Sequence, residues 1–223
     1  MSDPREPLTP PLAAEPATGP IGGQLSAVLG GLLTRARFVD LARRHDSVWL
    51  LGLFSFVNGC LSIGLMAVVA LVSGRPFIFP SLGPTAFLFF YTPLAPAASP
   101  RNTLCGHLIG ALAGWGCLVL FGLQHSGSSI ATGVTGARVG AAALSLGLTS
   151  GLMVLLKTPH PPAGATTLIF SLGVLRTLED VVILMIAVAL LTLQAIAINR
   201  LAGLPYPLWS APNPRVAASH VGS

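Results

Sequence analysis

Four long runs of apolar positions divide the central part of the chain. Each is long enough to cross the hydrocarbon core of a bilayer as one helix, which takes about 20 residues. The runs lie at Val48–Val72, Thr103–Leu123, Gly133–Leu156 and Asp180–Leu201. Two shorter apolar stretches, Phe77–Thr92 and His160–Val174, contain proline and glycine near their starts. At about 1.5 Å per residue, the helix that follows each interruption is only about 14–16 Å long, or half of a bilayer.

The composition agrees with this pattern. Hydrophobic residues make up 52% of the 223 residues and charged residues 9%. Such a chain has too little polar surface to cover a water-soluble globule of this size. We therefore expect an all-α membrane protein, a polytopic helix bundle of about six segments that forms one domain in the lipid bilayer.

The two ends of the chain differ from this bundle. Residues 1–34 are rich in proline, alanine and acidic residues and lack the apolar core of a signal peptide, so we expect a disordered tail. The transmembrane domain then covers residues 35–204, and a short C-terminal tail covers 205–223. Basic residues cluster before the first span, at Arg35, Arg37, Arg43 and Arg44. They predict a cytoplasmic N-terminus. We expect a multi-pass protein of a bacterial inner membrane.

The two interrupted stretches resemble each other. The sequence PSLGPT at residues 80–85 and the sequence PPAGAT at residues 161–166 share the pattern Pro-x-x-Gly-x-Thr. Each follows one long span and precedes another, which predicts two structural repeats at about 48–123 and 133–201. If each interrupted stretch crosses the membrane, the repeats are inverted, and if each dips in and returns, they are parallel. The positions of the basic residues favour inversion, because it puts more of them on the cytoplasmic side.

The second interruption, TPHPPAGAT, has the features of a broken membrane helix. Thr158 and His160 each precede a proline, which disfavours helical backbone and ends the preceding helix near Lys157. A new helix can begin at about Gly164. Its first amides, on Ala165, Thr166 and Thr167, would then lack an acceptor and lie at the positive end of the helix dipole. Such an end is suited to bind an anion. The first interruption offers fewer amides, because Pro84 has no N–H.

The charges predict the sign of a ligand. Between Asp46 and Glu179 the sequence has no carboxylate, whereas the cationic side chains there include Arg75, Arg101, Arg138 and Lys157. Cation channels and most proton-coupled pumps use carboxylates within the membrane, so anions or neutral solutes remain. The lack of a carboxylate near any central histidine also argues against an enzyme. The cysteines form no metal-ligand pattern, and we expect no metal, no cofactor and no nucleic-acid partner.

Three motifs together resemble the HPP family of integral membrane proteins, named for the tripeptide His-Pro-Pro. They are TPHPPAGATTL (158–168), PSLGPTAFLFF (80–90) and PRNTLCGHLIGAL (100–112), and the resemblance covers about Val48 to Leu201. Plant plastid-envelope and cyanobacterial members are associated with nitrite transport. The resemblance therefore implies a transporter or channel for a small inorganic anion, with nitrite as the leading candidate. The residues that match the motifs are Pro80, Gly83, Thr85, Arg101, Asn102, His107, His160, Pro161, Pro162, Gly164 and Thr166.

We expect these residues to bind the substrate together with three neighbours, Ala165, Thr167 and Lys157. Structural roles remain open for them. His160 can cap a helix or bond a carbonyl in the break, and His107 can bond a neighbouring helix. Arg101 and Asn102 can anchor a loop at the headgroups, and Lys157 can snorkel to the interface.

Glycines recur every four residues in two of the spans, at Gly106, Gly110 and Gly114 and at Gly147 and Gly151. We predict that they let helices pack closely. Thr177 and Asp180 are predicted to form a capping box at the start of the last span. Two functions stay open, an anion transporter or channel and a non-transporting membrane scaffold or sensor whose breaks serve only packing. Either is compatible with a homo-oligomer.

Overall fold

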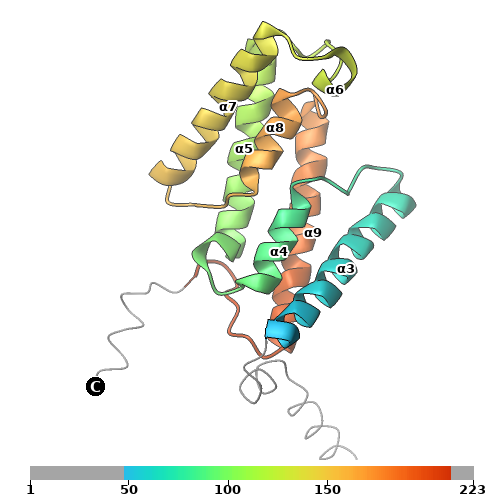
Figure 1. Ribbon diagram of the computed structural model, residues 1–223, viewed down its shortest axis with the longest axis vertical. Coiled ribbons are helices and arrows are strands. Elements are labelled where there is room, and N and C mark those ends of the chain that lie inside the picture. Colours follow the sequence, from blue (N-terminus) through green and yellow to red (C-terminus); the bar gives the residue numbers. More distant parts are fainter. Residues whose placement is uncertain (1–47, 212–223) are drawn as a thin grey trace, which may run out of the picture.

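The computed structural model describes residues 48–211, and within this range the chain is helical and contains no strand (Figure 1). In chain order the helices are α3 (Val48–Ser73), α4 (Leu82–Tyr91), the short 3-10 helix η1 (Pro96–Ala98), α5 (Pro100–Leu120), α6 (Ser129–Thr132), α7 (Gly136–Leu155), α8 (Ala163–Ser171) and α9 (Leu178–Leu201). The predicted N-terminal tail, the basic cluster at Arg35–Arg44 and most of the predicted C-terminal tail lie outside the described residues.

The spans predicted from the apolar pattern are confirmed. In the described part of the chain, α3, α5, α7 and α9 are the four helices long and apolar enough to cross a membrane. The two interrupted stretches form the short helices α4, of 10 residues, and α8, of 9 residues. The predicted capping box is also present, because the Thr177 side chain accepts from the Asp180 amide while the Asp180 carboxylate accepts from the Thr177 amide. The protein is an all-α membrane bundle.

The two short helices begin near the middle of the bundle and run toward opposite ends (Figure 1). In Figure 1, α3 rises from the lower end, the chain returns inward, and α4 descends from mid-height before α5 rises again. In the second half, α7 descends, α8 rises from mid-height, and α9 descends to the lower end. Every element of the second half thus runs opposite to its counterpart in the first.

Close packing around α5 holds the bundle together. This helix packs against α7, α8 and α9, and α4 packs against α3 and α9. A Cβ atom at Gly110 would come within 2.6 Å of the Ala163 carbonyl oxygen, and one at Gly114 within 2.5 Å of the Thr167 carbonyl oxygen. The α5 glycines therefore form the predicted close-packing face. The prediction is wrong for the α7 glycines, Gly147 and Gly151, where a Cβ would meet nothing within 4 Å.

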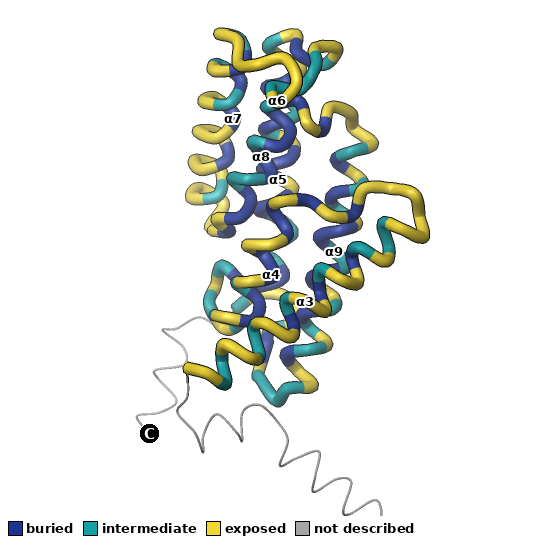
Figure 2. The backbone as a smooth tube through the Cα atoms, turned by 45° about the vertical axis from the view of Figure 1, so that its right-hand side comes forward, coloured by how far each residue is buried: buried dark blue, intermediate teal, exposed yellow. Residues whose placement is uncertain are grey.

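The outer helices expose apolar side chains. Figure 2 shows buried residues along α5 and α8 and many exposed residues along α3 and α7. The exposed fraction reaches 89% at Trp49 in α3 and 77% at Leu155 in α7. Exposed apolar surface on this scale is unfavourable in water and is neutral against lipid tails, which agrees with an integral membrane protein.

The segment after α9 folds back over the start of α5. The hydroxyl of the fully buried Tyr206 donates to the carbonyl of Ala98. The Arg101 amide donates to the Trp209 carbonyl at 2.9 Å, and Arg200 Nε donates to the Tyr206 carbonyl at 3.0 Å. These contacts fix the loop between α4 and α5, which carries η1.

Candidate functional site

The equivalent threonines of the two repeated motifs meet at one histidine. His107 of α5 has its Nε2 at 2.9 Å from Oγ1 of Thr85 in α4 and its Nδ1 at 2.7 Å from Oγ1 of Thr166 in α8. All three side chains are fully buried. Both threonines lie in the first turn of their short helices. The starts of the two half-helices therefore converge on the imidazole of His107.

His160 joins this group from the break before α8. Its Nε2 lies 3.2 Å from Nε2 of His107 and 3.3 Å from Oγ1 of Thr85. Its Nδ1 lies 2.7 Å from the carbonyl oxygen of Ala97 and 3.5 Å from Oγ1 of Thr103. The ring is fully buried. We refer to Thr85, Thr103, His107, His160 and Thr166 as the His-Thr cluster.

The partners assign a tautomer to each ring. The Ala97 carbonyl can only accept, so Nδ1 of His160 carries the hydrogen and Nε2 of the neutral ring is an acceptor. Nε2 of His107 faces this lone pair and carries a hydrogen, which leaves Nδ1 of His107 to accept from the Thr166 hydroxyl. The hydrogen bonds of the neutral pair thus run in one direction, from Thr166 through both imidazoles to Ala97.

The prolines and the α5 glycines explain the position of His160. Pro159 and Pro161 flank it, and α7 ends at Leu155 before this segment. A Cβ atom at Gly106 would come within 2.7 Å of the His160 Cβ, so only glycine leaves room for the histidine against α5. The sequence therefore breaks one helix and clears space on another to bring His160 to His107.

The amides expected to be free at the start of α8 are already bonded. This helix begins at Ala163, one residue earlier than predicted. The amides of Ala163, Gly164, Ala165 and Thr166 lie 3.0, 3.0, 3.1 and 3.4 Å from carbonyl oxygens of His160, Pro161, Pro162 and Pro162. The HPP tripeptide forms a turn whose carbonyls point toward these amides, because two successive prolines have fixed φ angles compatible with a helix start. The prediction that the Ala165 and Thr166 amides lack acceptors is therefore wrong.

Each break also contains a buried hydroxyl with no partner in the described part of the chain. Ser81, at the N-cap of α4, is fully buried, and Thr158, in the second break, is 2% exposed. Neither side-chain oxygen makes a hydrogen bond. An unsatisfied buried hydroxyl costs about 1–3 kcal/mol, so both are places where a ligand or a water molecule would be stabilised.

Arg101, Asn102 and Lys157 lie outside the cluster. The Arg101 guanidinium donates to the carbonyls of Lys157, at 3.2 Å, and Leu156, at 3.4 Å, and thereby caps the C-terminal end of α7. Asn102 is buried and its Nδ2 donates to the Pro96 carbonyl at 2.9 Å. Lys157 is exposed and has a φ of 53°. Arg101 and Asn102 thus have the anchoring contacts that the sequence left open for them.

The remaining predicted site residues surround the cluster without joining it. Thr167 is fully buried, and its hydroxyl lies 2.8 Å from that of Thr149 and donates to the Ala163 carbonyl. A Cβ atom at Gly83 would meet nothing within 4 Å, and one at Gly164 would meet only Leu146, at 3.4 Å. Pro80 and Pro161 are exposed, and Pro162 is buried.

Arg138 is a buried cation that the sequence did not single out as a site residue. It lies on α7 and is 2% exposed. Its Nη1 donates to the Ser171 carbonyl at 3.1 Å and its Nη2 to the Gly127 carbonyl at 2.6 Å. It therefore caps the C-terminal end of α8, as Arg101 caps that of α7.

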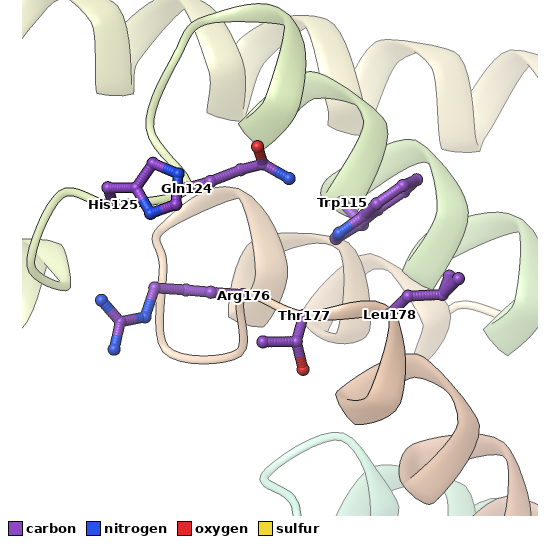
Figure 3. A pocket seen from close by; sticks show the side chains of 6 residues that line it. All are labelled: Trp115, Gln124, His125, Arg176, Thr177 and Leu178. Atoms are coloured by element: carbon purple, nitrogen blue, oxygen red, sulfur yellow. The ribbon is translucent and has the colours of Figure 1, made fainter.

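A pocket of about 500 Å³ lies between the C-terminal end of α5 and the start of α9 (Figure 3). Its lining side chains are Trp115, Gln124, His125, Arg176, Thr177 and Leu178. Trp115 lies on α5 about 12 Å farther along the helix axis than His107, at about 1.5 Å per residue. The pocket is therefore separate from the His-Thr cluster.

The chain matches a known protein family over all of these helices. The family described as "HPP, transmembrane region" matches residues 44–207, a range that includes α3 to α9 and both breaks. The chain belongs to the HPP family.

Two curated relatives of this HPP protein are transmembrane proteins of Dictyostelium discoideum. Each is 32% identical to it, over 94 residues in one and 93 in the other. The aligned part is 42% of this chain, and it spans only 30% and 27% of the lengths of the relatives. No solved structure matches the chain.

The sequence patterns of this HPP protein did not identify Thr103, a member of the His-Thr cluster, or Ala97, which bonds His160. Thr103 precedes His107 by one helical turn, so the i, i+4 spacing already placed both on one face of α5. Ala97 contributes only a backbone carbonyl, for which an alanine gives no signal. Among the described residues, no group of three His, Cys, Asp or Glu side chains could hold a metal ion.

Proposed function

We propose that this HPP protein transports a small inorganic anion across the membrane, with nitrite as the first candidate, through a site at the His-Thr cluster. One observation carries the proposal. The threonines of both repeated motifs hydrogen-bond to the same imidazole, that of His107, so the two broken helices share a single buried polar centre. Substrate sites at the meeting point of two broken helices are a recurring design of membrane transporters.

The chemistry of the centre favours an anion. The helix dipoles of α4 and α8 have their positive ends near mid-height, and the cluster consists of hydroxyls and imidazoles. In the described chain the carboxylates are Glu179 and Asp180, both in the first turn of α9. Because the α8 amides are bonded within their own turn, the hydroxyls and imidazoles are the groups that would contact the anion, with Ser81 and Thr158 as unpaired donors nearby.

The burial of the cluster favours a carrier. All five side chains are buried, and the two imidazoles and the Thr85 and Thr166 hydroxyls bond one another. An anion reaches such a centre only when helices move apart and these bonds exchange for bonds to the anion. A channel would need a continuous wet path at the same depth.

For the topology we propose an inverted repeat with both ends of the chain in the cytoplasm. The opposite courses of α3–α5 and α7–α9 in Figure 1 support inversion, and the basic cluster at Arg35–Arg44 supports a cytoplasmic N-terminus. A single cysteine placed in the loop at 124–129, in a protein whose native cysteines are replaced, should react with an impermeant reagent added to intact cells. Reaction of a cysteine placed in residues 205–211 instead would contradict the orientation.

Uptake into proteoliposomes tests the proposed function. Purified protein is reconstituted, nitrite entry is followed with an internal reporter, and protein-free vesicles supply the leak. We expect uptake well above the leak, with a loss of at least about tenfold in the Thr85→Val protein, because the hydroxyl that bonds both histidines is removed. A well-folded protein with no uptake of nitrite or other small anions would contradict the proposal.

One observation favours a non-transporting scaffold or sensor as the second candidate. The two imidazoles hydrogen-bond to each other and to Thr85, Thr166 and Ala97. Every ring nitrogen therefore has a partner, as a purely structural polar core requires. The same experiment separates the two functions, because a scaffold produces no flux and loses only stability when Thr85 is changed.

A further inference from the structure

In the described part of the chain, no arginine or lysine is hydrogen-bonded to the His-Thr cluster, and Arg75 and Arg200 have other partners. Arg101 is bonded to the carbonyls at the end of α7, and Arg138 to carbonyls at the end of α8 and in the loop after α5. Lys157 is exposed, and Arg176 donates to the Ser126 carbonyl in that same loop. A small anion that enters the cluster therefore finds dipoles and hydrogen-bond donors there, without a permanent positive charge.

The ionisable groups around the cluster leave the two histidines as its only proton acceptors. The elements packed around it carry Tyr91 on α4, Cys105 and Cys117 on α5, and the arginines and lysine already described, whereas η1 and α8 carry none. Tyr206, in the segment after α9, is bonded to the Ala98 carbonyl. On α9, Glu179 pairs with Arg75 at 2.6 Å and Asp180 caps its own helix. Within residues 48–211, none of these side chains hydrogen-bonds to His107 or His160.

Protonation changes the pair from a closed hydrogen bond into two converging donors. In the neutral pair, Nε2 of His160 accepts from Nε2 of His107 across 3.2 Å. If Nε2 of His160 takes up a proton while His107 keeps its tautomer, two N–H groups face each other at this distance and repel. Among the described side chains, the Thr85 oxygen is then the one acceptor that both can share. An oxyanion placed beside them can accept from both, and its charge balances the imidazolium.

From this geometry we propose that the His107–His160 pair binds a proton together with the anion, so that the protein carries both as one electroneutral load. The inference rests on the proposed function and names its coupling ion. An imidazolium alone is costly in a buried, carboxylate-free site, and an anion alone is equally costly there. Each ligand lowers the cost of the other, so the coupling is reciprocal. The imidazoles take the role that carboxylates have in most proton-coupled transporters.

The hydrogen bond to Ala97 decides which nitrogen of His160 can take up the proton. Nδ1 of His160 donates to the carbonyl of Ala97, which is half-buried and lies in η1, in the loop fixed by the segment after α9. This loop is at the end of the bundle where the described chain starts and finishes (Figure 1). The His107 side of the pair is bonded instead to α4 and α8. Because Nδ1 of His160 already donates to a carbonyl, the proton is taken up at Nε2, between the two rings.

The stoichiometry of the unmodified protein tests the inference directly. Nitrite uptake and internal pH are followed together in proteoliposomes whose membrane potential is set with potassium and valinomycin, and the leak of protein-free vesicles is subtracted. We expect about one proton for each nitrite, initial rates that ignore the potential, and accumulation that rises about tenfold for each pH unit of gradient, the equivalent of about 1.4 kcal/mol. Nitrite uptake that follows the potential and brings no protons would overturn proton coupling and leave the proposed function intact. An absence of any nitrite uptake would overturn both.

Substitutions locate the proton. In the His160→Gln and His107→Gln proteins, the number of protons per nitrite should fall at least about tenfold, and the residual nitrite uptake should now follow the membrane potential. His125→Gln is the matched control, because this imidazole is exposed and outside the cluster, and its ratio should stay near that of the parent. Coupling retained in both cluster variants, each shown folded by gel filtration, would place the proton elsewhere and overturn the assignment.

Discussion

The two breaks of this HPP protein begin alike and are held very differently. α3 is followed by Gly74 with a φ of 65°, and α7 by Lys157 with a φ of 53° after Leu156. Glycine adopts this left-handed conformation freely, whereas a lysine there costs about 1–2 kcal/mol. At the ends of α5, α8 and α9 the same conformation is taken by Gly122, Gly173 and Gly203. The second break thus carries strain that the first avoids.

The second break also has the stronger fixation. Arg101 donates to the carbonyls of Leu156 and Lys157 in this break. The amides of Leu156, Lys157 and Thr158 donate to carbonyls of α7, and α8, which follows, lies against the glycine face of α5. In the first break, the amides of Phe77, Ile78 and Phe79 make no hydrogen bond within residues 48–211, and a Cβ atom at Gly83 would meet nothing within 4 Å. The two halves therefore have the same arrangement of helices, but the second half is held more firmly and the first half can move more easily.

The largest effect should come from the contact that fixes the second half. In the Gly110→Val protein, the Cβ would lie 2.6 Å from the Ala163 carbonyl oxygen and 2.9 Å from the Thr167 hydroxyl, so α8 must shift. We expect a loss of about 1–3 kcal/mol or more in stability and loss of uptake. Gly116→Val on the same helix is the control, since its Cβ would meet nothing within 4 Å. Thermal unfolding in detergent and uptake in vesicles measure both, and equal behaviour of the two variants would contradict the packing role.

The two motif threonines compare the halves at the cluster itself. Thr85 bonds both imidazoles, and Thr166 bonds only His107, at Nδ1. Each change to valine should cost about 1–3 kcal/mol in stability. Thr166→Val leaves Nδ1 of His107 without its partner, and Thr85→Val removes the hydroxyl that bonds both imidazoles and the Ser81 carbonyl. For transport, Thr85→Val should lower the initial rate of nitrite uptake more than Thr166→Val. The Thr85 hydroxyl lies beside the bond between the two Nε2 atoms, which the anion must replace. A larger transport defect in Thr166→Val would reverse our assignment of the mobile half.

Substitutions of Lys157 and Arg101 should distinguish backbone strain from hydrogen bonding in the second break. Lys157→Gly should raise the unfolding free energy by about 1 kcal/mol, because glycine adopts the left-handed conformation without strain. Arg101→Gln should lower it by about 1 kcal/mol through loss of the two carbonyl bonds, and any loss of uptake should be independent of salt. A transport defect of Arg101→Gln that is strongest at low ionic strength would identify it instead as an anion-attracting charge.

Hydrogen exchange compares the breaks without any substitution. In detergent, the amides of Phe77, Ile78 and Phe79 should exchange faster than those of Leu156, Lys157 and Thr158, because the latter are bonded to α7 carbonyls. Mass spectrometry of peptides that cover each break measures the difference. Equal protection would contradict the division into a mobile and a fixed half.

The apolar pattern predicted the spans and breaks because both follow from local chemistry. A run of about 20 apolar residues has few alternatives to a membrane helix, and a residue before proline disfavours helical backbone wherever it occurs. The pairing of Pro-x-x-Gly-x-Thr motifs also identified Thr85 and Thr166, which the structure brings to one histidine. These features depend on neighbours in sequence, which a single chain displays.

The contacts between distant segments were less predictable. A free amide at a helix start is the default expectation, and only the folded turn reveals that the His160, Pro161 and Pro162 carbonyls accept those hydrogens. The spacing of four residues marked glycines on both α5 and α7, yet only the α5 set faces another helix. Which face of a helix is covered depends on the whole bundle, and the sequence pattern alone does not specify it.

The segment that folds back after α9 matters for anyone who adds a fusion partner to this protein. A tag joined directly after Leu201 would remove or displace Tyr206 and Trp209, which bond to Ala98 and Arg101. The adjacent Ala97 holds His160 in its tautomer, so a badly placed affinity handle could silence transport while leaving every span intact. Fusion partners and deletion endpoints are therefore best placed beyond residue 211, so that the segment after α9 keeps its contacts with the loop between α4 and α5.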